Sequence, residues 1–109
     1  MQFNELMSEV KGIGFSEVRK DADNYFEAVI VKDMVKILCQ RLERFLGLPV
    51  WPGENRLSPQ IEQAINEFGG IADGQTLYFC HQDNDIVFAM LWPWADGMCI
   101  TVKVARKGK

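Results

Sequence analysis

Residues 76–104 read TLYFCHQDNDIVFAMLWPWADGMCITVKV, and the three apolar runs separated by two turn signals in this stretch decide the fold prediction. The pair Asp83-Asn84 suits a two-residue hairpin turn, because both side chains tolerate positive φ angles. The segment from Pro93 to Gly97 is rich in turn residues and closes a second hairpin. The stretch therefore predicts a three-stranded antiparallel meander with strands at 76–82, 85–92 and 98–104.

The two turn lengths also predict which residues lie opposite one another. A two-residue first turn places Phe79 opposite Phe88, and a five-residue second loop places Phe88 opposite Val102. Both registers gather bulky side chains on one face, which we expect to be the core. The other pairs expected on that face are His81–Ile86, Leu77–Met90, Met90–Ile100, Ile86–Val104 and Trp92–Met98.

The opposite face of the meander is also partly apolar. It carries Tyr78, Val87, Ala89 and Leu91. An uncovered patch of this kind predicts self-association. A helix at 3–11, or strands at 15–31, would be the competing cover.

The first half of the chain predicts a helix, a hairpin and a second helix. Apolar residues at helical spacing indicate a helix at 3–11. Strands are expected at 15–20 and 25–31, around a turn at 21–24. Asp33 is the expected N-cap of a helix at 34–46 that ends at Gly47. A single helix over 25–46 keeps the same spacing and is the disfavoured alternative.

Residues 47–57 contain too many helix and strand breakers for a regular element. Ser58 then caps a helix predicted at 59–68, with Pro59 at its first position. The whole chain, 1–109, is expected to form one α+β domain with a mainly antiparallel sheet of four to five strands. The helices at 34–46 and 59–68 are expected on one face of the sheet, the face formed by Phe79, Phe88, Met90, Ile100 and Val102.

Composition narrows the classes of partner. The formal net charge of −3 provides no broad positive field, so nucleic acid is not expected as a partner. The basic cluster of Arg106, Lys107 and Lys109 is interpreted as a solvated tail. No apolar run reaches the roughly 18 residues of a membrane span, and no signal peptide is recognised, so a cytoplasmic protein is predicted. Three widely spaced cysteines predict free thiols rather than disulfides.

Few catalytic arrangements are open to this sequence. His81 is the single histidine, and it points to the opposite strand face from Cys80, which excludes that pair as nucleophile and base. His81 is expected to be partly buried at the end of the core face. Cys39 with His81 is the remaining thiol and base pair, in a pocket between the helix at 34–46 and the sheet. Asp83 and Asp85 are interpreted as turn residues, and no metal or cofactor is expected.

Tryptophan-bearing loops are the features that point most directly to binding. Trp51 and Trp94 lie in breaker-rich loops, and Asp96 stands beside Trp94, whereas Trp92 continues the core alternation. The competing interpretation is that these indoles plug the ends of a small core. The leading hypothesis is a non-catalytic binding or protein-interaction module that uses Trp51, Trp94 and Asp96 to hold a protein partner or a small ligand. A homodimer is compatible with it, and a small enzyme using carboxylate or thiol chemistry is the alternative.

Overall fold

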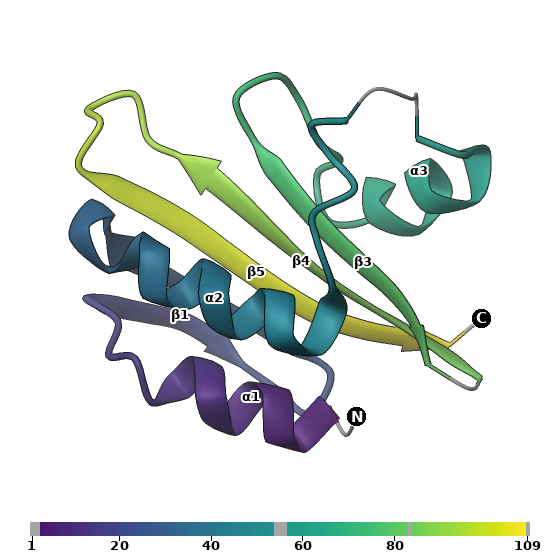
Figure 1. Ribbon diagram of the computed structural model, residues 1–109, viewed down its shortest axis with the longest axis horizontal. Coiled ribbons are helices and arrows are strands. Elements are labelled where there is room, and N and C mark those ends of the chain that lie inside the picture. Colours follow the sequence, from purple (N-terminus) through teal and green to yellow (C-terminus); the bar gives the residue numbers. More distant parts are fainter. Residues whose placement is uncertain (1–2, 54–56, 83, 109) are drawn as a thin grey trace.

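A computed structural model describes residues 3–53, 57–82 and 84–108 and has three helices around a five-stranded antiparallel sheet. Figure 1 shows helices α1 and α2 side by side across the sheet. The strand order is β1-β2-β5-β4-β3, so the last strand of the chain lies at the centre. The helices are α1 (Phe3–Lys11), α2 (Val35–Leu46) and α3 (Pro59–Asn66), and the strands are β1 (Glu17–Asp21), β2 (Tyr25–Val31), β3 (Thr76–Gln82), β4 (Asp85–Pro93) and β5 (Cys99–Gly108).

The predicted fold class is confirmed, and so are most of the elements. The C-terminal meander is present, and its first hairpin pairs Phe79 with Phe88 and Leu77 with Met90 as the two-residue turn requires. Asp83, one half of that turn, lies outside the described residues. Strands β1 and β2 form the predicted hairpin, so the alternative of one helix over 25–46 is wrong.

The second hairpin has a different register from the predicted one. Trp92 lies opposite Thr101 instead of Met98, a shift of three residues. The strand continues through Pro93, and the Trp94 N–H donates to the Cys99 carbonyl at 2.9 Å, which moves the turn toward the C-terminus. Asp96 holds that turn, because its Oδ1 accepts from the Met98 N–H at 2.8 Å. An odd shift moves every side chain of β5 to the other face of the sheet.

The predicted core face is therefore wrong in its β5 residues. Helices cover the sheet on both sides, so there are two cores and not one. One core, on the face of α1 and α2, contains Ile100, Val102 and Val104 of β5. The second core, on the opposite face, joins α3 to Phe79, Phe88 and Met90. The predicted core face therefore combined residues of two opposite faces: Phe79, Phe88 and Met90 belong to one, and Ile100 and Val102 belong to the other. The patch predicted for self-association is buried beneath α1 and α2, namely Tyr78, Val87, Ala89 and Leu91.

Of the two predicted helix N-caps, Ser58 is correct and Asp33 is wrong. The Ser58 hydroxyl accepts from the Ile61 N–H at 3.3 Å, as predicted, although α3 ends at Asn66 rather than at residue 68. Asp33 does not cap α2. It lies instead in a short 3-10 turn, Lys32–Met34, and the N-cap position belongs to Met34, which makes no side-chain cap bond.

None of the three described cysteines, Cys39, Cys80 and Cys99, is in a disulfide bond, as predicted. No helix among the described residues combines the length and apolar character needed to cross a membrane.

Candidate functional site

The candidate site lies where one row of side chains, running across the sheet from strand to strand, changes from apolar to charged residues. Directly opposed residues share a face. Leu77 pairs with Met90, Met90 with Lys103, Lys103 with Glu27, and Glu27 with Lys20. On this face, strands β3 and β4 are therefore apolar, whereas β5, β2 and β1 carry charged groups. The border between the two halves runs between β4 and β5.

Helix α3 covers only the apolar half of this face. Its Ala64 and Ile65 are buried in the core that includes Phe88. Phe68, just after the helix, closes that core at the border: its ring meets Phe88 edge-on at 5.1 Å between centroids and stacks on Tyr25 at 5.3 Å. The Tyr25–Phe68 stack thus marks the edge of the part of the sheet that α3 covers.

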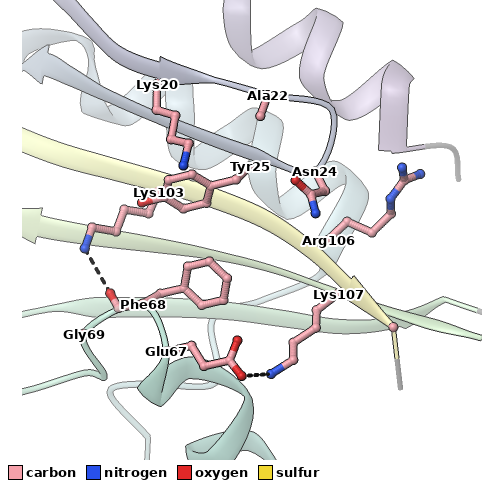
Figure 2. Close-up of a pocket in the computed structure, with 11 residues that line it drawn as sticks. Lys20, Ala22, Asn24, Tyr25, Glu67, Phe68, Gly69, Lys103, Arg106 and Lys107 are labelled. Atoms are coloured by element: carbon pink, nitrogen blue, oxygen red, sulfur yellow. Dashed lines mark hydrogen bonds and ion pairs between the residues drawn. The ribbon is translucent and has the colours of Figure 1, made fainter.

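A cavity of about 680 Å³ opens at this edge, and we call it the lysine pocket. Its volume lies within the range of small-ligand sites, roughly 300 to 1,000 Å³. Figure 2 shows Tyr25 and Phe68 facing each other at its centre, with charged side chains around them. The lining includes four cationic residues, Lys20, Lys103, Arg106 and Lys107, and one carboxylate residue, Glu67.

Three lysines reach the lysine pocket from two strands. Lys20 of β1 holds its Nζ 5.7 Å from the centroid of the Tyr25 ring. Lys107 of β5 pairs with Glu67 at 2.9 Å, and both of these side chains are partly exposed to solvent. An ion pair so exposed stabilises a protein by at most about 1 kcal/mol, so a competing anion displaces it easily.

Lys103 is the most enclosed of the three amines. Its Nζ donates to the Phe68 carbonyl at 2.9 Å and lies 3.5 Å from the centroid of the Trp92 ring. Burial lowers the pKa of Lys103, and the nearby Glu27 carboxylate partly opposes that shift. Among the described residues, no carboxylate oxygen lies within 4 Å of the Nζ of Lys103 or of Lys20.

Tyr25 supplies a neutral hydroxyl beside these amines. Its phenol donates to Glu27 Oε1 at 2.5 Å. Burial is the main cause that raises the pKa of Tyr25 above its usual value, and the hydrogen bond to Glu27 adds to it. The phenol therefore stays protonated at neutral pH, and Glu27 is held by Tyr25 rather than by a lysine.

Arg106 contributes to the wall of the lysine pocket but not to its charged interior. Figure 2 shows its guanidinium turned away from Tyr25 and toward α1, in accord with its position 5.0 Å from the Phe3 ring. Its backbone N–H donates to the Asn24 carbonyl at 2.9 Å, which ties the β1–β2 turn to β5. The cations that face the interior are therefore lysine amines; that of Lys103 already donates to the Phe68 carbonyl, so those of Lys20 and Lys107 are the more accessible to a ligand.

The structure places the predicted site residues apart from one another. Trp51 lies beside β3, where it bridges to Leu77, and its indole N–H donates to the Ala72 carbonyl at 3.3 Å. Trp94 is half-buried and donates to the Thr101 hydroxyl at 2.8 Å, with Arg19 of β1 over its ring. Since β1 and β3 are opposite edges of the sheet, the two indoles do not form one surface.

Asp96 and His81 lie at different places, and of the two only His81 departs from its predicted exposure. Asp96 is exposed, and its carboxylate accepts from backbone N–H groups of its own turn, which is a structural use. His81 is exposed rather than partly buried, and its ring meets Phe79 edge-on at 5.4 Å. Cys39 packs against the core on the other side of the sheet, so the sheet separates it from His81 and they form no nucleophile and base pair.

The lysine pocket was missed because its residues look like ordinary surface lysines in the sequence. Arg106 and Lys107 belong to β5, so the interpretation of this cluster as a solvated tail is wrong for both, and Lys109 lies outside the described residues. One signal was available: Lys103 interrupts a β-branched strand between Val102 and Val104. The ammonium group of a lysine in a central strand must reach water, either at an edge of the sheet or where no helix covers the sheet.

Comparisons of this chain with protein-family models, with curated protein sequences and with solved structures found no match.

Proposed function

We propose that this protein is a non-catalytic binding domain whose lysine pocket holds an anionic group of its ligand. The observation that carries the proposal is that three lysines, Lys20, Lys103 and Lys107, line one cavity around the Tyr25–Phe68 stack. Two of these amines have no carboxylate within 4 Å among the described residues, and the third is held by one exposed ion pair.

The aromatic stack and the amines are suited to different parts of one ligand. Ammonium groups attract carboxylates and phosphates, and their preference is electrostatic. The rings of Tyr25 and Phe68 add apolar contact area next to them. An organic anion therefore fits the lysine pocket better than a bare inorganic ion. The protein's overall negative charge supports a local site over a broad basic surface for nucleic acid.

The catalytic alternative has less support. Its thiol version needed Cys39 and His81 together, and they lie on opposite sides of the sheet. Within the lysine pocket, Tyr25 is kept neutral and Glu67 is paired, which favours holding an anion over transferring a proton. A cytoplasmic location stays part of the proposal, and its support is that none of the three described cysteines is in a disulfide bond.

Thermal unfolding of the full chain with benzoate, citrate or inorganic phosphate tests the proposal. A bound anion raises the melting temperature, because it binds the native state only. We expect benzoate and citrate to be more effective than phosphate, and the effect to weaken as salt is added.

Charge variants give the sharper comparison. Lys20→Gln and Lys107→Gln should each weaken benzoate binding about fivefold, whereas Glu67→Gln should strengthen it by releasing Lys107. Lys36→Gln is the matched control, because Lys36 is an exposed lysine of α2 outside the lysine pocket. Equal binding by all four variants, or no stabilisation by any of the anions, would contradict the proposal.

A further inference from the structure

A second cavity, which we call the indole pocket, lies beside the lysine pocket and has the opposite character. Its volume is about 340 Å³. Apolar side chains form about half of its wall, and the charged residue that lines it is an acid, Glu62. Its apolar residues are Trp51, Leu57, Ile65 and Ile71. This pocket suits a large apolar side chain and disfavours a carboxylate.

Gly69 lines both cavities, so the two cavities meet at this residue. Gly69 is exposed, with φ +103°, and Gly70, with φ +71°, continues the rim of the indole pocket. Backbone N–H groups of both glycines are used internally, by the carbonyls of Asn66 and Ile65. Among the described residues, no donor reaches the carbonyl of Gly69 or Gly70, which leaves two backbone acceptors at the boundary of the two cavities.

We propose that the ligand is an extended peptide segment of a partner protein, with an acidic residue in the lysine pocket and a large apolar residue in the indole pocket. This inference rests on the proposed function and names its partner class. Charge complementarity sets the direction: the carboxylate is drawn to Lys20 and Lys107 and repelled by Glu62. The chain between the two residues crosses at Gly69, where its N–H groups meet the free carbonyls.

The spacing of the two peptide residues follows from the size of the cavities. Cavities of these volumes that share a wall have centres on the order of 10 Å apart, which an extended chain spans in about three residues. The acidic and apolar residues should therefore stand at positions i and i+3, with small residues between them to pass the glycine wall. Adjacent positions would be too close to fill both cavities.

The probe is the peptide acetyl-Asp-Gly-Ser-Leu-amide, titrated calorimetrically into the full chain. Replacing its Leu by Gly should weaken binding roughly tenfold, because the burial of the Leu side chain in the indole pocket is lost. Replacing its Asp by Asn should weaken binding about fivefold and remove the dependence on salt. A peptide with Leu directly after Asp should bind as weakly as the peptide in which Leu is replaced by Gly.

Fluorine NMR of the chain labelled with 5-fluorotryptophan gives a readout that needs no folded variant of the indole pocket. The Trp51 resonance should move with the Leu peptide and stay in place with the Gly peptide. A protein variant adds a second test: Leu57→Ser should remove the benefit of the peptide's Leu, whereas Leu48→Ser, a control at a 76% exposed position, should not.

The outcomes separate the two proposals. If benzoate binds at the lysine pocket but the Leu and Gly peptides bind equally and the Trp51 resonance does not move, the two-pocket peptide site is overturned and the anion site stands. If neither benzoate nor any Asp peptide binds, both proposals fall. A peptide that binds through Leu alone, with Asp and Asn equivalent, overturns the two-pocket peptide site, and the anion site then stands or falls with the benzoate result.

Discussion

A Cβ atom at Gly69 would lie 2.4 Å from Cη2 of the Trp92 indole, so these two residues fit only because position 69 has no side chain. Lys103 packs on the same indole, at 3.5 Å from its ring centroid. The indole therefore lies against the backbone of residue 69 at its Cη2 edge and has the Lys103 ammonium over its face. The indole nitrogen of Trp92 is buried and has no hydrogen-bond partner in the part of the chain that the structure describes.

Gly69→Ala should lower the free energy of unfolding by about 3 kcal/mol, since it adds a steric clash to the strain of φ +103°. Gly74→Ala is the control: its φ is +84°, but nothing lies within 4 Å of its Cβ position. That control should cost only the backbone term, about 1 to 2 kcal/mol. Urea unfolding followed by circular dichroism measures both, and equal losses would mean that Trp92 yields to the added methyl group.

The two candidate helix caps give a second matched pair. Ser58→Ala should lower the free energy of unfolding by about 1 kcal/mol, because the Ser58 hydroxyl accepts the Ile61 N–H. Asp33→Ala should change it by less than about 0.5 kcal/mol, because Asp33 makes no cap bond to α2. The same urea titration compares them. A larger loss at Asp33 than at Ser58 would restore the sequence-based cap.

The contrast between these caps shows where sequence reasoning succeeds on local structure. Ser58 stands directly before Pro59 and an apolar stripe, so three signals agree on one position. At Asp33, the apolar pattern runs on from β2 through the 3-10 turn, and the chain turns into the helix one residue later than the cap signal. Elements were therefore predictable, and the exact geometry of this junction was not.

Register was predictable only where the turn was short. The two-residue turn between β3 and β4 left one register that matched both strands. In the second hairpin, Pro93 was assigned to the loop but belongs to β4, and the N–H of Trp94 continues the pairing by donating to the Cys99 carbonyl. Apolar side chains on either face of β5 made both registers look consistent. Strand β4 did carry the missing information, because residues 86–91 are all apolar, as expected for a strand buried on both faces.

The candidate site depends on the β4–β5 register and therefore could not be predicted from the sequence. Lys103 enters the lysine pocket only because it pairs with Met90 and Glu27. In the predicted register, Lys103 would have faced the opposite side of the sheet. The position of α3, which leaves Tyr25 and Phe68 at an open border, is a tertiary arrangement that no local pattern encodes.

Trp94 and Thr101 are coupled by a hydrogen bond at the end of the sheet, and their coupling is measurable. Trp94→Phe should lower the free energy of unfolding by about 1 to 2 kcal/mol, because it leaves the buried Thr101 hydroxyl without its indole donor. Thr101→Val should cost less, since the half-buried Trp94 N–H can reach water. The double variant should be more stable than the sum of the single losses implies, by about 1 kcal/mol. Strict additivity would mean that Trp94 acts through surface contacts alone.

The two tyrosines of the chain should resist ionisation until the protein unfolds. Burial is the main cause that raises the pKa of both above the usual value of 10; hydrogen bonds to Glu27 for Tyr25, and to Cys39 and Glu43 for Tyr78, add to it. Near-ultraviolet absorbance of the native protein should therefore show no tyrosinate at pH 10, whereas the urea-unfolded chain titrates normally. A native tyrosinate signal at that pH would contradict the packing of both phenols.

The same raised pKa values set the direction of the stability change with pH. A phenol whose folded-state pKa lies above 10 contributes stability that is complete below pH 10 and is lost as the pH rises further, because the unfolded chain then releases the proton. Tyr25→Phe should reduce the number of protons released on unfolding above pH 10 by about one. Comparing the variant with the parent cancels the opposite contribution of Lys103, whose pKa is lowered by burial. An unchanged proton release in the variant would mean that Tyr25 ionises freely in the folded protein, and that the lysine pocket has a charged rather than a neutral phenol at its centre in alkaline solution.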